Sequence, residues 1–384
     1  MRILVALTYY RPHVSGLTIY AERLARGLAR RGHEVTVLTS RFHPRLLASE
    51  RLDGVRVVRV PVVAKVSKGV VMPLFPLYAR TEIRRHDLVN VHMPQLEAAL
   101  LAALGRLHRK TVVLTYQCDL RLPPGLLNRI VQGALVPLNH LAARLAHRVT
   151  AMTRDYADHS PFLRRYQEKF RVTPPLVELP PPRPAVTARF VDRYGLAGRR
   201  RIAFAARFAA EKGVEMLLRA LPRVASEIPD VCVVFTGAAH ETVGEQKYHE
   251  KLRPLLEEQR ERLFFFDLLS AEEMASFFAL ADVLAVTSLN STESFGLVQA
   301  EAMLSGTPVV ATDLPGVREA VRRTGMGEIV PPGDPEALAR ALLRVLRHPE
   351  RYVRPREEIL RTFSVDEALD RVEEVFRDAS HETP

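Results

Sequence analysis

The sequence has few cysteines and no long hydrophobic run. Its two cysteines, Cys118 and Cys232, lie far apart among 384 residues, each beside a strand-like run, so we expect no disulfide and a reducing compartment. The apolar run at the N-terminus ends after a few residues at Tyr9, too early for a signal peptide. No segment approaches the roughly 18 apolar residues that a spanning helix needs. We therefore expect a cytoplasmic protein without a membrane span.

Motifs of cofactor and metal chemistry are also missing. The turn after the first predicted strand contains Gly16 but no G-x-G-x-x-G, which disfavours a nicotinamide dinucleotide. We find no D-x-D, no H-E-x-x-H and no cluster of Cys and His with the spacing of metal ligands. Gly16 still lets a ligand approach the backbone ahead of a helix, where an anion is favoured, although a plain turn is the alternative.

Charge is distributed unevenly along the chain. Residues 1–183 contain 29 Lys and Arg against 12 Asp and Glu, a formal charge of +17, whereas the remainder contains 26 against 32, a charge of −6. At about 100–200 residues per domain, the chain is too long for one core, so two domains of different charge are expected. No DNA-binding motif or aromatic-lined basic face accompanies the basic half, and we expect no nucleic-acid partner.

Short apolar runs alternate with longer amphipathic runs in both halves. The predicted strands are 2–7, 34–39, 55–60, 87–92, 111–116, 148–153, 201–206, 231–236, 262–266, 282–287, 308–312 and 328–330. The predicted helices are 17–31, 95–107, 125–147, 155–165, 213–227, 247–260, 271–279, 295–305, 335–347 and 364–378. This order predicts parallel sheets covered on both faces. The proline-rich stretch 173–190 is predicted to be a linker between two Rossmann-like domains, which face each other across a ligand-binding cleft.

Two turns at the ends of predicted strands carry candidate residues. Arg207 and Lys212 follow strand 201–206 and suit a diphosphate, with a solvated basic loop as the alternative. Glu293, in the turn after strand 282–287, can accept hydrogen bonds from ligand hydroxyls or interact with the helix dipole. Glu301, about two turns along the next helix, can hold a vicinal diol such as ribose, or be a surface glutamate whose apolar neighbours indicate partial burial. The backbone N–H groups at the start of that helix would be free to meet a phosphate or sugar oxygen; they belong to Phe295, Gly296 and Leu297.

These segments resemble the retaining glycosyltransferases of family four, the glycosyl transferase group 1 enzymes of GT-B fold. Glu293 and Glu301, with seven residues between them, resemble the family's E-x7-E motif. Residues 11–40 are similar to its glycine loop and following strand, residues 207–221 to its Arg…Glu-Lys-Gly segment, and residues 301–342 to its closing elements. Four motifs in the expected order cover nearly the whole chain.

The resemblance implies a metal-independent hexosyltransferase without a cofactor, which moves a sugar from a nucleoside-diphosphate sugar to a hydroxyl acceptor with retention. It implies an acceptor domain at 1–183, a donor domain at 184–362 and a C-terminal helix at 363–384, for which packing back on the N-terminal domain is one arrangement. The implied catalytic residues are Arg207, Lys212 and Glu293. The implied donor-binding residues are these three with Gly16, Phe295, Gly296, Leu297 and Glu301.

The chain departs from the family's pattern on the acceptor side. Gln117 occupies the histidine position of T-x-H-D, and Pro94 replaces the second histidine of V-V-H-x-H, whereas His92 is kept. Glutamine cannot titrate, so proton transfer at that position is excluded. We expect His92, Gln117 and Asp119 to bind the acceptor, a glycan, a lipid or a small molecule, although His92 could instead be structural.

Three alternatives stay open. Residues 122–148 are apolar, acid-poor and flanked by arginine, so they form either a core helix with an arginine rim or a helix on an anionic membrane, which would make the protein peripheral at the inner face. The function could also be that of a sugar-nucleotide epimerase of the same architecture. A nucleotide-sugar binding protein without turnover is the third.

Overall fold

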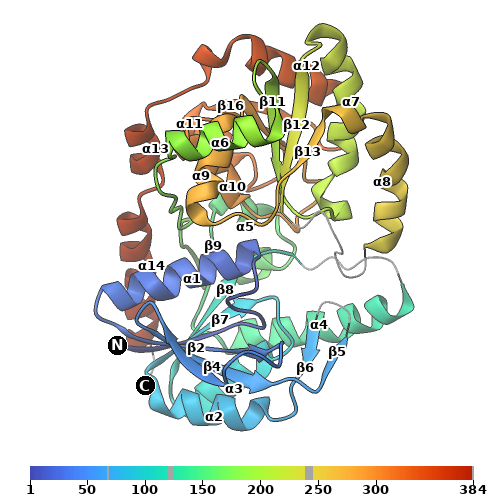
Figure 1. The fold of residues 1–384 in the computed structure, drawn as a ribbon. Helices are drawn as coiled ribbons and strands as arrows, with labels where there is room; N and C mark the ends of the chain where they lie inside the picture. Colours follow the sequence, from blue (N-terminus) through green and yellow to red (C-terminus); the bar gives the residue numbers. More distant parts are fainter. Residues whose placement is uncertain (67–68, 120–124, 238–244, 383–384) are drawn as a thin grey trace. The chain divides into compact units, whose positions relative to one another are not determined.

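The computed structural model describes residues 1–66, 69–119, 125–237 and 245–382 (Figure 1). The chain forms two compact units. Unit 1 consists of Met1–Leu176 and Val365–Pro384, and unit 2 of Val177–Ser364. The chain therefore leaves unit 1 once and returns to it for its last helix.

Unit 1 is built on a sheet whose order, within the described residues, is β10-β9-β8-β7-β1-β2-β4-β3. All neighbouring strands are parallel except the edge pair β3 and β4. Every residue of β7 and β8 is buried, as expected for central strands covered on both faces. The strands are β1 (Arg2–Ala6), β2 (Glu34–Arg41), β3 (Ser49–Leu52), β4 (Val55–Pro61), β7 (Leu88–Met93), β8 (Thr111–Tyr116), β9 (Arg148–Ala151) and β10 (Phe170–Val172).

Helices and one small hairpin complete unit 1. The hairpin pairs β5 (Ala64–Val66) with β6 (Gly69–Val71) after β4. The helices are α1 (Gly16–Arg30), α2 (Phe75–Arg85), α3 (Ala98–Leu107), α4 (Leu126–Leu145), α5 (Arg154–His159), the 3-10 turn η1 (Leu163–Tyr166) and α14 (Val365–His381). In the described part of the chain, no helix combines the length and the hydropathy needed to cross a membrane.

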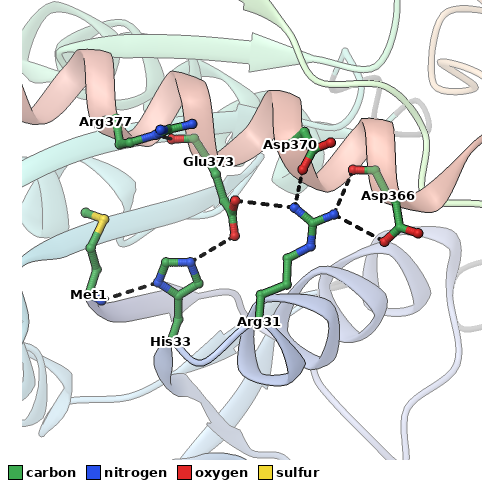
Figure 2. Close-up of polar contacts among 7 residues, drawn as sticks. All are labelled: Met1, Arg31, His33, Asp366, Asp370, Glu373 and Arg377. Atoms are coloured by element: carbon green, nitrogen blue, oxygen red, sulfur yellow. Dashed lines mark hydrogen bonds and ion pairs between the residues drawn. The ribbon is translucent and has the colours of Figure 1, made fainter.

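Helix α14 is held to the first helix by both packing and charge. Its apolar side packs so closely that a Cβ added to Gly27 of α1 would lie 2.8 Å from a methyl group of Leu369. At the end of α1, the Arg31 guanidinium binds the carboxylates of Asp366, Asp370 and Glu373, at 2.5 Å for Asp370 (Figure 2). The interaction therefore joins residues about 340 positions apart into one unit, and its several partners fix the register of the helix.

Unit 2 is built on a parallel sheet of order β13-β12-β11-β14-β15-β16. The strands are β11 (Arg200–Ala205), β12 (Val231–Thr236), β13 (Leu263–Phe265), β14 (Val283–Val286), β15 (Val309–Thr312) and β16 (Gly327–Val330). The helices are α6 (Pro184–Tyr194), α7 (Val214–Glu227), α8 (Gln246–Glu258), α9 (Ala271–Leu280), α10 (Leu297–Leu304), α11 (Glu319–Thr324), α12 (Pro335–Arg347) and α13 (Arg356–Thr362), with 3-10 turns η2 (Ala210–Lys212), η3 (Arg260–Arg262) and η4 (Pro349–Arg351).

The predicted α/β architecture with parallel sheets is confirmed, and three local predictions are wrong. Residues 184–190 of the predicted linker belong to α6, because Pro184 occupies a first-turn position that needs no N–H. The predicted helix 155–165 ends at His159, because Pro161 disfavours a helical Ser160, whose ψ is 123°. The helix expected from Phe295 begins at Leu297, after Gly296 in the left-handed conformation.

Helix α4 fits the core interpretation only in part. Ala142 and Ala143 join the core of unit 1, whereas Val136 and Leu141 are exposed. Residues 122–124 of the predicted segment lie outside the described residues.

Candidate active site

Lys212 is placed by a tight junction between η2 and α7. The following residue, Gly213, has a φ of 64°, and an added Cβ would lie 2.2 Å from the carbonyl oxygen of Thr287. Only glycine fits this close approach without strain. The turn that carries Lys212, after β11, therefore lies directly against the end of β14.

Lys212 and Glu293 form an ion pair. The Lys212 ammonium binds the Glu293 carboxylate, and the Ser288 hydroxyl lies 3.4 Å from the same carboxylate oxygen. The two side chains are 22% and 18% exposed, so a ligand can reach them. Strands β11 and β14 are neighbours at the point where the strand order reverses, which is where open α/β sheets bind ligands. The structure thus brings together a predicted cation and a predicted acid that are 81 residues apart.

Thr287 holds the turn that carries Lys212 in place. The sequence did not identify this residue. Its buried hydroxyl lies 2.8 Å from the carbonyl oxygen of Lys212 and 2.9 Å from that of Gly213. The backbone N–H of Leu289 also donates to the carbonyl of Glu211 at 2.9 Å. The only sequence signal is that Thr287 is the first residue after β14.

We expect Thr287→Val to lower turnover by about fivefold, because one lost hydrogen bond of about 1 kcal/mol loosens the Lys212 turn and leaves carbonyl oxygens unsatisfied. Thr287→Ser keeps the hydroxyl and should restore most of the turnover. Steady-state kinetics measures the turnover of the wild type and the two variants, which are compared only if their melting temperatures are equal. Equal rates for the valine variant and the wild type would contradict the positioning role.

Arg207 lies in the same turn but makes a different contact. Its guanidinium is 3.4 Å from the carboxylate of Glu211, and its side chain is 39% exposed. Within the part of the chain that the structure describes, this long contact leaves most of the guanidinium donors available to a ligand. Arg207 and Lys212 therefore both present cations after β11, each beside its own glutamate.

The start of α10 offers backbone donors. No hydrogen bond runs from the N–H groups of Phe295, Gly296 or Leu297 to any residue that the structure describes. The side-chain amide of Gln299 donates to the carbonyls of Phe295 and Val317, at 2.7 and 3.0 Å, and so holds the segment in place. Phe295 itself is buried. Two of these N–H groups thus precede the helix rather than belong to it.

Glu301 is more buried than its apolar neighbours in the sequence led us to expect. It is 5% exposed in the middle of α10, between the buried Ala300 and Ala302. A ribose-binding role stays a prediction, as does the diphosphate role of Gly16 in unit 1. Gly16 is the first residue of α1, and its exposed backbone has open space where a Cβ would stand.

His92 and Gln117 contact each other in unit 1. The Gln117 amide donates to Nδ1 of His92 at 3.3 Å, which leaves the ring proton on Nε2. His92 is 1% exposed, and burial lowers its pKa to about 3. Its Nε2 has no hydrogen-bond partner among the described residues. His92 is therefore neutral at physiological pH and cannot act there as a charged acid.

We expect the ring resonances of His92 to stay constant from pH 8 to pH 5 in an NMR titration, whereas an ordinary histidine titrates near its usual pKa of about 6.5. The folded pKa is depressed, so the unfolded chain binds the proton first. His92 should therefore lower the free energy of unfolding as pH falls below about 6.5, by up to about 1.4 kcal/mol per pH unit. A His92 titration midpoint above pH 6 would contradict this assignment.

Asp119 occupies a buried polar network beside these residues. Its Oδ1 accepts hydrogen bonds from the hydroxyls of Tyr116, at 2.9 Å, and Ser160, at 2.6 Å, while its N–H donates to the Tyr156 hydroxyl at 2.6 Å. Burial, together with the Asp119 charge, raises the pKa of the Tyr116 phenol. Asp119 Oδ2 is buried without a partner in the described part of the chain. A buried carboxylate oxygen without a hydrogen bond lowers the stability of the fold, so this oxygen is suited to accept a hydrogen bond from a ligand.

The described residues contain no group of three or more His, Cys, Asp and Glu side chains that could hold a metal ion. Arg207, Lys212 and Glu293 come together at one end of the unit 2 sheet, while His92, Gln117 and Asp119 lie at the ends of β7 and β8 in unit 1. Like β11 and β14, strands β1 and β7 adjoin where the order of their sheet reverses. Both units therefore place predicted site residues at a favoured ligand position.

Comparisons with known proteins cover nearly the whole chain. Residues 191–361 match the family model of glycosyl transferases group 1, and residues 15–176 match that of the glycosyl transferase 4-like domain. The chain is 30% identical over 402 residues to D-inositol 3-phosphate glycosyltransferase of Xylanimonas cellulosilytica, with 96% of this chain and 93% of that protein covered. It is 28% identical over 375 residues to GDP-mannose-dependent alpha-(1-6)-phosphatidylinositol monomannoside mannosyltransferase of Mycolicibacterium smegmatis, with 91% and 90% covered.

Solved structures show the same fold. Anabaena Alr3699/HepE, in complex with UDP, superposes with a TM-score of 0.78 at 21% identity, over 98% of this chain and 100% of that one. Sucrose-phosphate synthase (tll1590) from Thermosynechococcus elongatus gives 0.75 at 20% identity, with 98% of each chain covered. The expected GT-B fold is thereby confirmed. The chain belongs to the glycosyl transferases group 1, glycosyltransferase family four, and is a glycosyltransferase.

Proposed function

We propose that the protein is a metal-independent, retaining hexosyltransferase that binds a nucleoside-diphosphate sugar on unit 2 and a hydroxyl acceptor on unit 1. The ion pair of Lys212 and Glu293 is the observation that carries the proposal. It sets a cation for the diphosphate next to a carboxylate for sugar hydroxyls, at the strand-order reversal of the sheet. Arg207 adds a second cation, and the N–H groups of residues 295–297 add neutral donors. The nucleoside-diphosphate sugar is a substrate, and no cofactor takes part.

The mechanism follows from the charge that develops. The bond between the anomeric carbon and the diphosphate oxygen breaks, and its electron pair goes to the diphosphate. Lys212 and Arg207 stabilise that negative charge, which is the largest single contribution expected in such a site. The acceptor oxygen forms the new bond on the face that the diphosphate leaves, and its proton passes to the leaving oxygen. Configuration is retained and no side-chain base is needed, in keeping with a neutral His92.

The acceptor is proposed to carry several hydroxyl groups. Asp119 Oδ2 would accept a hydrogen bond from one hydroxyl, and His92 Nε2 would donate to another oxygen, because both are buried polar atoms without a described partner. The names of the two relatives mention inositol-containing molecules, one of them a phospholipid. This supports a lipid-linked acceptor, with a glycan or a soluble cyclitol as further members of the class. A lipid-linked acceptor would place the protein at an anionic membrane surface, as the +17 charge of residues 1–183 also favours.

The first experiment is a thermal-shift screen against UDP-, GDP- and ADP-sugars, since a ligand that binds only the folded protein raises its melting temperature. The stabilising donor is then incubated with inositol and phosphoinositide acceptors in the presence of EDTA, and the anomeric configuration of the product is read by NMR. Transfer with retention supports the proposal. Conversion of the donor alone would support an epimerase, and binding without any conversion a non-catalytic protein.

A further inference from the structure

Exposed apolar side chains in unit 1 concentrate around the β5–β6 hairpin. In this hairpin, Ala64 pairs with Val71 and Lys65 with Val70, so alternate pairs face opposite sides. Val70 is buried in the core of the unit, whereas Ala64, Val66 and Val71 are exposed. One side of the hairpin therefore anchors it, and the other presents an apolar face to its surroundings.

Neighbouring residues in the sequence are also apolar and exposed. Val63, before the hairpin, is 68% exposed, and Leu77, in the first turn of α2, is 65% exposed. Leu74 lies between them in the sequence and is also exposed. We call this set the hairpin surface; it comprises Val63, Ala64, Val66, Val71, Leu74 and Leu77. Several large apolar residues exposed in one segment indicate a surface that binds a partner rather than one that stays in contact with water.

The hairpin surface lies on the edge of unit 1 where the acceptor residues lie. The hairpin follows the carboxyl end of β4, which runs parallel to β2, β1 and β7. Val14, after β1, and Leu96, after β7, are exposed apolar residues of the loops on this same edge. His92 belongs to β7. A partner that covers the hairpin surface would therefore meet the edge to which we assign the acceptor.

Charge identifies the kind of partner. Residues 61–81 contain Lys65, Lys68 and Arg80 and no Asp or Glu. Lys65 and Arg80 are exposed. Apolar side chains flanked by cations and free of acids match the interface of an anionic bilayer, where acyl chains lie beneath negative headgroups.

We propose that the hairpin surface inserts into the interface of an anionic phospholipid bilayer and so brings the acceptor edge of unit 1 to a lipid-linked acceptor. The choice of acceptor rests on the proposed function, whereas bilayer binding itself does not. The hairpin surface is separate from α4, the segment for which the sequence suggested membrane contact.

Vesicle co-sedimentation tests the proposal with the full chain. The vesicles consist of phosphatidylcholine alone, or of equal parts of phosphatidylcholine and phosphatidylglycerol. The triple variant Val66→Ser, Leu74→Ser and Leu77→Ser should bind the anionic vesicles at least about tenfold more weakly than the wild type, because it removes several inserted methylene groups. Lys65→Gln with Arg80→Gln should weaken binding to the anionic vesicles only.

Two exposed leucines supply the matched control. Leu107 at the end of α3 is 72% exposed, and Leu268 of unit 2 is 67% exposed. The variant Leu107→Ser with Leu268→Ser should bind vesicles like the wild type. Because every substituted side chain is exposed, all of these variants should keep the melting temperature of the wild type.

The proposal is overturned if the wild type does not bind anionic vesicles, or if the triple variant binds them as the wild type does. A triple variant that turns a dimer into a monomer in sedimentation velocity, with vesicle binding unchanged, would assign the surface to a second protein copy and also overturn it. Donor-dependent thermal shift and transfer to a water-soluble acceptor should be the same in the triple variant and the wild type. If the wild type showed neither the donor-dependent thermal shift nor the transfer, the proposed function would be refuted, whereas the vesicle result would still hold.

Discussion

Lys212→Ala is expected to lower turnover by on the order of a hundredfold or more, the effect of removing one preorganised electrostatic contact from a developing charge. Before the donor binds, Glu293 holds the ammonium and the Thr287 hydroxyl holds the backbone of Lys212, so the lysine needs no reorganisation during the reaction. The same variant should weaken binding of the free nucleoside diphosphate, because the lysine is assigned to the phosphate rather than to the sugar. Single-turnover kinetics and calorimetric titration of the nucleoside diphosphate measure the two effects.

A matched control separates this role from the loss of a surface charge. Lys251 is also paired with a glutamate of unit 2, Glu215 at 3.8 Å, and is 59% exposed. Lys251→Ala should leave turnover within about twofold of the wild type, because this lysine is exposed and its long, partly solvated contact with Glu215 contributes little. If Lys212→Ala changes turnover by less than about threefold, the assignment of the diphosphate site is wrong.

Glu293→Gln is expected to lower kcat/KM for the donor sugar by about 10- to 100-fold, since a hydrogen bond to a charged group contributes about 1.5–3 kcal/mol. The amide keeps the size of the side chain but loses the charge that orders Lys212. Affinity for the free nucleoside diphosphate, which lacks the sugar, should not fall. A comparison of the complete donor with the nucleoside diphosphate alone therefore distinguishes sugar recognition from phosphate recognition.

The double variant Lys212→Ala with Glu293→Gln tests whether the two residues act as a unit. Residues in direct contact show coupling, so the double variant should lose less than the product of the two single losses. Strictly multiplicative losses would mean that the ion pair does not operate in the enzyme with donor bound. A Glu293→Gln variant that loses nucleoside-diphosphate affinity as strongly as Lys212→Ala would contradict the separate roles.

Much of the fold could be predicted because the central strands are continuous apolar runs. Strands such as β8 and β12 are buried along their whole length, and that leaves a clear sequence signal. The short strand β3, with the sequence SERL, lies at the edge and is partly exposed, so it lacks both an apolar run and strict alternation. Helix α2 begins with the sequence Phe-Pro-Leu-Tyr and carries arginines at its end, which hid its helical period.

The site could be predicted only in part. Their positions after predicted strands, together with the resemblance, identified Lys212 and Glu293. Their contact depends on β11 and β14 being neighbours, however, and strand order is a property of the folded sheet. Thr287 could not be recognised, because a threonine after a strand usually does no more than end it. The orientation of Asp119, with one oxygen satisfied and the other open, likewise depends on tyrosine and serine hydroxyls, the furthest of which comes from a residue 41 positions away.

Helix α14 has a consequence for synthesis on the ribosome. Translation proceeds from the N-terminus, so α1 is made without the helix that covers Gly27 and neutralises Arg31. Unit 2 has its whole sequence available once Ser364 has emerged, whereas unit 1 still lacks α14 and the apolar side chains that this helix buries. The part of the protein that is translated first is therefore the last to become complete, and a nascent chain stalled before residue 365 would expose the apolar residues that α14 covers.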